Sequence, residues 1–321
     1  MAVYTQVSAE AMAAFLTRYD VGELRVAKGI AEGVENSNYL VETTSGRFIL
    51  TLYEKRVDEA DLPFFIALLD HLAAKGCKVP RFIPDRNGTR LQKLAGRPAC
   101  LIEFLPGISV TEPTPDQCHA AGRALGTLHK AVADFPLMRA NALGPDGWAD
   151  LMDKIDKGFD EVQPGLAAKA EKAAEAIFTA WPGRLDYCVI HADLFPDNVL
   201  SVGDEVTGLI DFYFACSDIR AYDLAVTHSS WCFSHDGQQF YPARAAALVQ
   251  GYQQAHGLTP DERAAMPVLC QGASLRFFLT RVYDWLHTPA DALVTRKDPL
   301  AYWRRLETYR TGDQARLFGA A

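Results

Sequence analysis

Hydrophobic and polar positions alternate in short runs through the first third of the chain, and this pattern predicts strands. The predicted strands cover residues 24–31, 39–44, 47–53, 91–94 and 98–105. One helix interrupts them at about 58–75, where Leu62, Phe65 and Leu69 recur at helical spacing before Gly76 marks the end. The first part of the chain is therefore predicted to be an antiparallel sheet with one helix.

Beyond Pro106-Gly107 the apolar residues recur at helical spacing almost throughout. The predicted helices lie at about 115–133, 148–159, 164–180, 221–231, 241–256, 260–286 and 299–309. Only two short apolar runs, 188–190 and 208–210, look like strands, and each ends directly in polar residues. We expect an α+β protein with an N-terminal lobe at 1–103 and a helical C-terminal lobe at 104–321, joined by a short hinge near 103–107.

Composition and charge narrow the class of protein. A chain of 321 residues with 49% hydrophobic content can bury the core of two lobes. The formal charge of −8 argues against a nucleic acid or an anionic membrane as partner, because either would be met by a basic face. No export signal or apolar run of roughly 20 residues is visible. Seven widely spaced cysteines without a C-x-x-C pair indicate a reducing compartment, and we expect a cytoplasmic protein.

The chemistry is concentrated after the two predicted strands of the second half. His191-Ala-Asp193-Leu-Phe-Pro-Asp197-Asn198 follows the first, and Asp211-Phe212 follows the second. A D-x-x-x-x-N segment followed by a hairpin and D-F is the arrangement kinases use, in which the Asp orients the substrate hydroxyl. Asn198 and Asp211 would then hold Mg²⁺ on the phosphates of ATP, because magnesium prefers hard oxygen ligands. Asp193 is the predicted catalytic base.

Plainer interpretations exist for single members of this group. Asp and Asn commonly cap turns, and Asp197, between Pro196 and Asn198, fits a structural turn. We expect His191 to support the loop as a buried ring that bonds loop carbonyls, rather than to shuttle protons. Hydrolytic sites are disfavoured, because the sequence contains no H-E-x-x-H, G-x-S-x-G or G-x-x-x-x-G-K-[ST] motif.

A possible phosphate-binding turn lies between the predicted strands 24–31 and 39–44. Gly33-Val-Glu-Asn-Ser37-Asn38 contains no G-x-G-x-x-G, but its backbone N–H groups and the Ser37 hydroxyl could point at phosphates. A plain hairpin is an equal alternative. We therefore place Gly33, Ser37 and Asn38 in the candidate nucleotide site only because the D-x-x-x-x-N loop follows.

At these motifs the sequence resembles the aminoglycoside-phosphotransferase and choline-kinase superfamily, a branch of the protein-kinase-like bilobal fold, whose signature is H-x-D-x-x-x-x-N. Within it the chain resembles, more narrowly, the bacterial homoserine kinases. The segments that carry this likeness are 1–5, 33–39, 48–56, 62–65, 191–200 and 209–216. The resemblance implies transfer of the ATP γ-phosphoryl group to the hydroxyl of L-homoserine, in threonine biosynthesis. The sequence leaves open whether the protein is a monomer or a homodimer.

The same resemblance assigns roles to residues. It makes Asp193 the base, Asn198 and Asp211 the magnesium ligands, and Glu103 to Leu105 the hinge whose backbone bonds adenine. Thr51 stands where most kinases have the lysine that steadies the α- and β-phosphates. This departure keeps open a nucleotide-binding module without activity, beside the alternative of a kinase for an aminoglycoside, choline or a sugar.

Substrate recognition is the least determined part. An amino acid with a reactive hydroxyl requires an acidic group for its ammonium and an Arg or N–H pair for its carboxylate. Arg276, Thr280 and Asp284 are spaced for one face of a late helix, and we take Arg276 and Asp284 as candidates against the alternative of a structural network. Asp223, in Ala221-Tyr-Asp-Leu-Ala, is interpreted as a buried residue that pins the catalytic loop.

Overall fold

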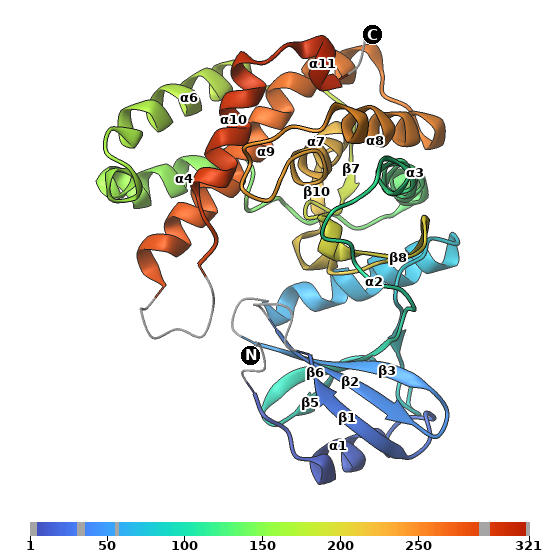
Figure 1. Cartoon of the computed structure of the whole chain (residues 1–321). Coiled ribbons are helices and arrows are strands. Elements are labelled where there is room, and N and C mark those ends of the chain that lie inside the picture. The colour runs from blue at the N-terminus through green and yellow to red at the C-terminus, as the bar shows by residue number, and fades with distance from the viewer. Residues whose placement is uncertain (1–4, 31–35, 55–57, 289–295, 319–321) are drawn as a thin grey trace. The chain divides into compact units, whose positions relative to one another are not determined.

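The computed structural model describes residues 5–30, 36–54, 58–288 and 296–318. The described residues up to Pro106 form one compact unit, and those from Gly107 onward form a second (Figure 1). An antiparallel sheet in one unit and a mostly helical second unit confirm the predicted α+β class.

The first unit is built on a six-stranded antiparallel sheet in the order β1-β2-β3-β6-β4, with β5 paired to β6. Its strands are β1 Leu24–Gly29, β2 Asn36–Thr43, β3 Arg47–Tyr53, β4 Phe82–Ile83, β5 Gln92–Leu94 and β6 Arg97–Glu103. Its helices are α1 Ala9–Leu16 and α2 Leu62–Ala74. The Ser8 hydroxyl accepts a hydrogen bond from the Ala11 N–H at 3.2 Å and so caps α1.

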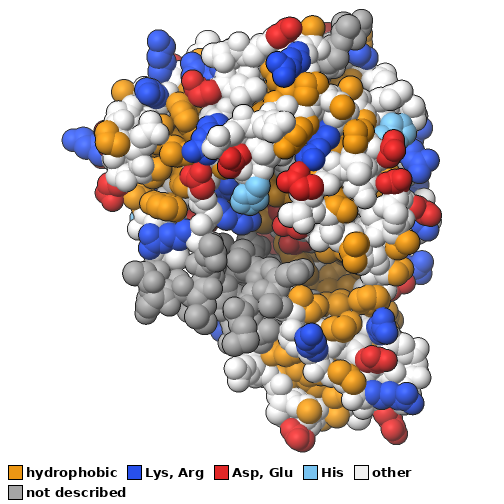
Figure 2. Space-filling view, in the orientation of Figure 1, with side chains coloured by type: hydrophobic (Ala, Val, Ile, Leu, Met, Phe, Trp, Pro, Cys, Tyr) orange, Lys and Arg blue, Asp and Glu red, His pale blue; other side chains and the backbone are white. Residues whose placement is uncertain are grey.

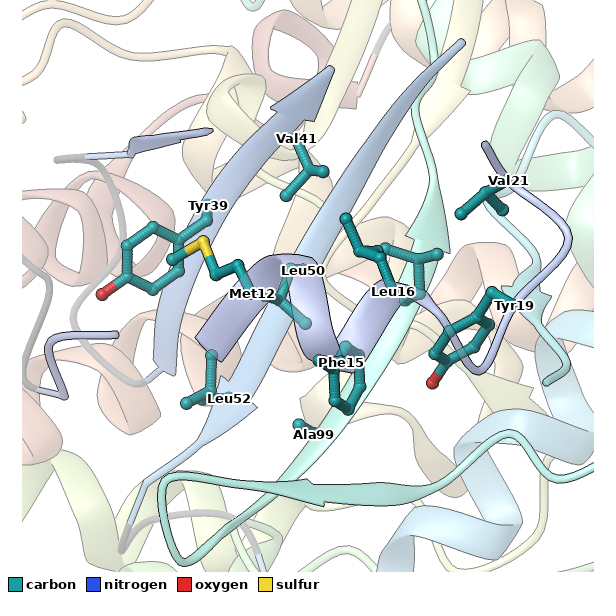
Figure 3. Close-up of a cluster of buried hydrophobic side chains, with 11 residues drawn as sticks. Met12, Phe15, Leu16, Tyr19, Val21, Tyr39, Val41, Leu50, Leu52 and Ala99 are labelled. Carbon is teal, nitrogen blue, oxygen red and sulfur yellow. The ribbon is translucent and has the colours of Figure 1, made fainter. Parts of the chain in front are cut away.

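One face of this sheet is covered by α1. Met12, Phe15 and Leu16 of α1 point toward Leu50 and Leu52 of β3 and form the core shown in Figure 3. Side chains alternate between the faces of a strand, so the residues between these core positions belong to the opposite face. This alternation decides below which residues of β2 and β3 can take part in nucleotide binding.

The second unit contains nine α-helices among its described residues and two small antiparallel strand pairs, β7 with β10 and β8 with β9 (Figure 1). The helices are α3 Pro115–Ala131, α4 Pro145–Ile155, α5 Phe159–Val162, α6 Leu166–Ala180, α7 Arg220–Trp231, α8 Pro242–Ala255, α9 Pro260–His287, α10 Leu300–Thr311 and α11 Gln314–Phe318. The strands are β7 Tyr187–Ile190, β8 Val199–Val202, β9 Glu205–Leu209 and β10 Cys216–Ile219.

The central helices α7 and α9 are buried along much of their length and carry residues that support the loop after β7. The longer one, α9, begins at a capping box in which the Thr259 and Glu262 side chains each accept a hydrogen bond from the other's N–H. On the face of the second unit seen in Figure 2, Lys and Arg side chains are interspersed with Asp and Glu. No helix among the described residues is long and apolar enough to cross a membrane.

The expectation of only two strands in the second half was wrong. The structure adds β8 and β10, and in the first unit it adds the two-residue strand β4. The predicted helix at 148–159 in fact begins at Pro145 and ends at Ile155, and residues 156–162 form shorter helical turns. These elements are short or polar, so their apolar pattern is too weak to detect.

Candidate active site

The loop after β7 is shaped by a residue in a disfavoured backbone conformation. Ala192 has φ of 63°, in the left-handed region, which costs a non-glycine residue roughly 1 kcal/mol or more. Both of its peptide groups are held: the Ala192 N–H donates to Asp223 Oδ1 at 2.8 Å, and Arg276 Nη1 donates to the Ala192 carbonyl at 2.5 Å. The loop is therefore held from two helices, α7 and α9.

Asp223 of α7 is the main anchor of this loop. Its carboxylate also accepts the His191 N–H at 2.7 Å and contacts His129 Nε2 at 3.0 Å, while His129 Nδ1 contacts the Tyr252 hydroxyl at 2.9 Å. Burial raises the pKa of Asp223, but the hydrogen bond and charge of His129 and the loop N–H groups outweigh it and leave the pKa below its usual value. Asp223 thus has the pinning role expected from the sequence.

His191 is fully buried, and its ring is bonded inside the loop. Its Nδ1 accepts the Asp193 N–H at 3.3 Å, and its Nε2 lies 3.0 Å from the Ile210 carbonyl. This pattern assigns the proton to Nε2, and burial lowers the pKa of His191, so the ring is neutral. His191 therefore joins the loop after β7 to the end of β9.

Asp193 and Asn198 are held together by the amide of Asn198. Asn198 Nδ2 donates to the Asp193 carbonyl at 2.8 Å and to Asp193 Oδ2 at 3.3 Å. This orientation leaves Asn198 Oδ1 as a hard acceptor. Burial raises the pKa of Asp193 well above its usual value; Arg276 opposes this, while the charge of Asp211 adds to it.

Asp211 is positioned by a backbone hydrogen bond of the preceding residue. The Ile210 N–H donates to the Asn198 carbonyl at 3.0 Å, which sets Asp211 beside the loop, and Asp211 itself is exposed with φ of 65°. Among the described residues, no three His, Cys, Asp or Glu side chains gather as a metal site. One amide oxygen and one carboxylate fit a magnesium ion that takes its remaining ligands from phosphates and water.

The two candidates for substrate binding are not brought together. Arg276 is only 2% exposed, and its guanidinium lies 4.6 Å from the ring centre of Phe277 and 5.5 Å from that of Phe214. Asp284 is exposed and lies eight residues, or about 12 Å, further along α9. Because Arg276 is buried under the loop and bonds its backbone, we now interpret it as a support for Asp193.

In the first unit, Gly33 lies outside the described residues, and the expectation for the Ser37 hydroxyl was wrong. Ser37 is fully buried on the face of the sheet that α1 covers, where its Oγ accepts the Thr5 N–H and donates to Glu54 Oε1 at 2.8 Å. Strand alternation therefore turns Ser37 away from Thr51, the position of the missing lysine.

Asn38 does lie on the face of Thr51. The two residues are directly paired between β2 and β3, and Thr51 Oγ1 donates to Asn38 Oδ1 at 2.7 Å.

The predicted hinge follows the last strand of the first unit. Glu103 ends β6, and among the described residues the Leu105 N–H has no hydrogen-bond partner. A backbone N–H without an internal partner can donate to a ligand.

His129 and Tyr252 were missed by sequence reasoning. Both lie inside helices, α3 and α8, without a neighbouring motif, so their link to Asp223 comes from tertiary packing alone. No local signal in the sequence could have identified them.

The loop of Asp193 and Asn198, followed by Asp211 after a hairpin, in a helical unit that accompanies an antiparallel sheet unit, defines a phosphotransferase of the protein-kinase-like class. Residues 26–266 match the model of the phosphotransferase enzyme family. A homoserine kinase of Gluconobacter oxydans is 51% identical over 313 residues, which cover 97% of this chain and 99% of that protein. A homoserine kinase of Methylorubrum populi is 52% identical over 319 residues, 99% of each chain.

Solved structures agree on the fold. Amicoumacin kinase hAmiN aligns with a TM-score of 0.70 at 15% identity, covering 95% of this chain and 94% of its own. An aminoglycoside phosphotransferase from Alicyclobacillus acidocaldarius aligns with a TM-score of 0.69 at 16% identity, covering 98% and 95%. The chain belongs to the phosphotransferase enzyme family, in the group that contains these homoserine kinases.

Proposed function

We propose that the protein is an ATP-dependent kinase that phosphorylates the side-chain hydroxyl of L-homoserine to give O-phospho-L-homoserine. The observation that carries this proposal is a sequence identity of 51–52%, over nearly the whole chain, to several proteins named homoserine kinase. The fold and the loop geometry agree with a phosphoryl transfer but do not select the acceptor, because structures at 15% and 16% identity share only the fold.

In the proposed reaction, Asp193 accepts a hydrogen bond from the homoserine hydroxyl and takes up its proton. The hydroxyl oxygen forms a bond to the γ-phosphorus, the bond from that phosphorus to the β,γ-bridging oxygen breaks, and ADP leaves. Positioning and charge neutralisation supply most of the catalysis. Asn198 holds the Asp193 carboxylate in place, while Asp223 and Arg276 hold the loop backbone.

Asn198 Oδ1 and the Asp211 carboxylate would hold Mg²⁺, which, bound with ATP, neutralises charge on the phosphates. In the N-terminal lobe, proposed to span residues 1–103, the backbone of Glu103 and Leu105 would bind adenine. Asn38 and the turn containing Gly33 would contact the phosphates. The amide of Asn38, oriented by Thr51, is the polar group nearest in register to the missing lysine.

The setting of this reaction is also a proposal. All seven cysteines are free thiols, which suits a reducing cytoplasm, and the partners would be the small molecules ATP and homoserine. A monomer or a homodimer would serve equally, because Asp193, Asn198 and Asp211 all come from one chain.

The acceptor is tested by measuring ADP release with homoserine, choline, an aminoglycoside and a hexose at equal concentrations. We expect a kcat/KM for homoserine at least about 100-fold above the others, since a site built for one polar substrate leaves its own groups unpaired with another. Turnover of another acceptor with none of homoserine would replace the proposed substrate. Nucleotide binding without turnover of any acceptor would instead support the binding module.

A further inference from the structure

Arg281 of α9 is a partly buried cation that packs against α10. Its guanidinium carbon lies 4.5 Å from the ring centre of Tyr302 in α10, and its Nη1 donates to the Asp298 carbonyl at 3.1 Å. A guanidinium stacked on an aromatic ring and fixed at one corner has little freedom to lose when it binds a second group. The residue is therefore preorganised.

Aromatic contacts connect Arg281 to the loop. Phe195, two residues after Asp193, packs on Phe277 with ring centres 4.9 Å apart and on Tyr302 at 6.4 Å, and Phe277 lies 5.0 Å from Tyr302. Phe277 precedes Arg281 by one helical turn, so both share a face of α9. The charges of Asp298 and Asp193 favour the charged form of Arg281 and so act against the lowering of its pKa by burial.

The neighbouring arginines have other partners. Arg305 is 4% exposed and donates to the carbonyls of Ala301 and Ser234, and Arg304 pairs with the Asp298 carboxylate at 3.1 Å. Arg281 makes no ion pair within the part of the chain that the structure describes, and burial lowers its pKa. A partly desolvated guanidinium that forms no ion pair is unfavourable, and an incoming anion would relieve that penalty.

We propose that Arg281 binds the α-carboxylate of the amino-acid substrate and so aims its hydroxyl at Asp193. The inference rests on the proposed function, because it requires an acceptor that carries a carboxylate. With Nη1 bound to the Asp298 carbonyl, Nε and Nη2 present the planar pair of donors that matches a carboxylate. Lys297 is the nearby alternative cation, but it is exposed and lacks such a stacked, fixed geometry.

The test pairs a change in the protein with a change in the substrate. Arg281→Gln and Arg281→Lys are assayed with homoserine and with 3-aminopropan-1-ol, which has the same hydroxyl and ammonium but no carboxylate. The readout is KM, and where the amino alcohol is not turned over, its inhibition constant against homoserine replaces its KM. Arg304→Gln is the matched control. It lies in α10, the helix of Tyr302, and removes a hydrogen bond to the Asp298 carboxylate, but it does not alter Arg281 itself. Thermal unfolding midpoints check that each variant is folded.

We expect Arg281→Gln to raise the KM for homoserine by about 100-fold, Arg281→Lys to raise it by about 10-fold, and Arg304→Gln to leave it within about twofold. The KM or inhibition constant of 3-aminopropan-1-ol should stay within about twofold of its value for the unchanged protein in all variants, because this compound has no carboxylate to lose its partner. An equal loss for both acceptors, or an unchanged KM for homoserine, overturns the role of Arg281 while leaving the kinase activity intact. Absence of homoserine turnover in the unchanged protein would instead overturn the proposed function.

Discussion

Asn198 uses the two halves of its side-chain amide for different purposes. Its Nδ2 donates to the backbone and side chain of Asp193, which leaves Oδ1 for a cation. Asparagine suits this position because one planar group both holds the base and supplies a neutral metal ligand. The charge of the proposed magnesium site therefore comes from Asp211 alone on the protein side.

Asp211→Asn should accordingly weaken magnesium binding, because it removes the charge of this ligand. We expect the concentration of Mg²⁺ needed for half-maximal rate, and the KM for ATP, to rise by about 10-fold or more. Steady-state rates over a magnesium titration measure both. Asp197→Asn is the matched control, because Asp197 is exposed in the turn Pro196–Asn198 and should leave both values unchanged. An unaltered magnesium dependence in Asp211→Asn would remove Asp211 from the site.

At the scale of single residues, the sequence predicted what a linear motif contains. Asp193, Asn198 and Asp211 share one loop and one hairpin, so their spacing in the chain fixes their spacing in the fold. His129, and Arg281 in its proposed role, could not be found in this way, because the positions of both depend on helix packing. Ser37 was misplaced because the predicted strand begins at residue 39, whereas β2 begins at Asn36 and turns Ser37 to the face that α1 covers.

The helices α3 and α8 approach each other closely through glycines. A Cβ built on Gly122 of α3 would lie 2.0 Å from the Leu248 carbonyl oxygen, and one on Gly251 of α8 would lie 2.0 Å from the His119 carbonyl oxygen. Both obstacles are backbone atoms, which cannot move aside without separating the helices. Because α3 carries His129 and α8 carries Tyr252, this close approach also brings Tyr252 within hydrogen-bond distance of His129, which in turn contacts Asp223.

Gly122→Ala should therefore destabilise the protein, although alanine favours helices by about 1 kcal/mol. We expect a net loss of about 2 kcal/mol in the free energy of unfolding from the forced separation of α3 and α8. Urea unfolding followed by circular dichroism measures it. Gly183→Ala should change little, because a Cβ there meets no atom within 4 Å. An equally stable Gly122→Ala protein would show that the helices can separate without loss.

Among the elements, the long helices were predictable, whereas the short strands β4, β8 and β10 were not. The helix at 260–286 was predicted almost to its ends because Thr259, Pro260 and Glu262 mark its start. In β10 the residues Cys216-Ser-Asp-Ile219 include Asp218, which is buried but bonds Asn141 Nδ2 at 2.5 Å. A buried, paired carboxylate breaks the apolar pattern on which strand prediction depends.

His228 connects three parts of the second unit. It lies in α7, its Nδ1 contacts the Tyr309 hydroxyl of α10 at 2.6 Å, and its Nε2 lies 3.1 Å from the Leu317 carbonyl of α11. The ring is fully buried, and burial lowers its pKa to about 4. The neutral ring matches both partners, donating to Leu317 and accepting from Tyr309.

The stability of the whole molecule should consequently depend on pH through His228. The unfolded chain binds a proton below a pKa of about 6.5, while the folded protein does not until about 4, so stability falls as pH drops between these values. The loss amounts to at most about 3 kcal/mol. In urea unfolding at pH 7 and pH 5, His228→Gln should flatten this slope, and the exposed His235→Gln should keep it. An unchanged slope in His228→Gln would exclude His228 as its source.

Asp193, as the group that receives the proton of the acceptor hydroxyl, is the central residue of the proposed reaction. The most direct measurement is the rate of ADP release with homoserine by Asp193→Asn, together with its dissociation constant for ATP. We predict that kcat falls by about 1,000-fold while ATP affinity stays within about twofold, because asparagine keeps the shape of the loop but cannot accept the proton. A variant that retains most of its turnover would contradict the account.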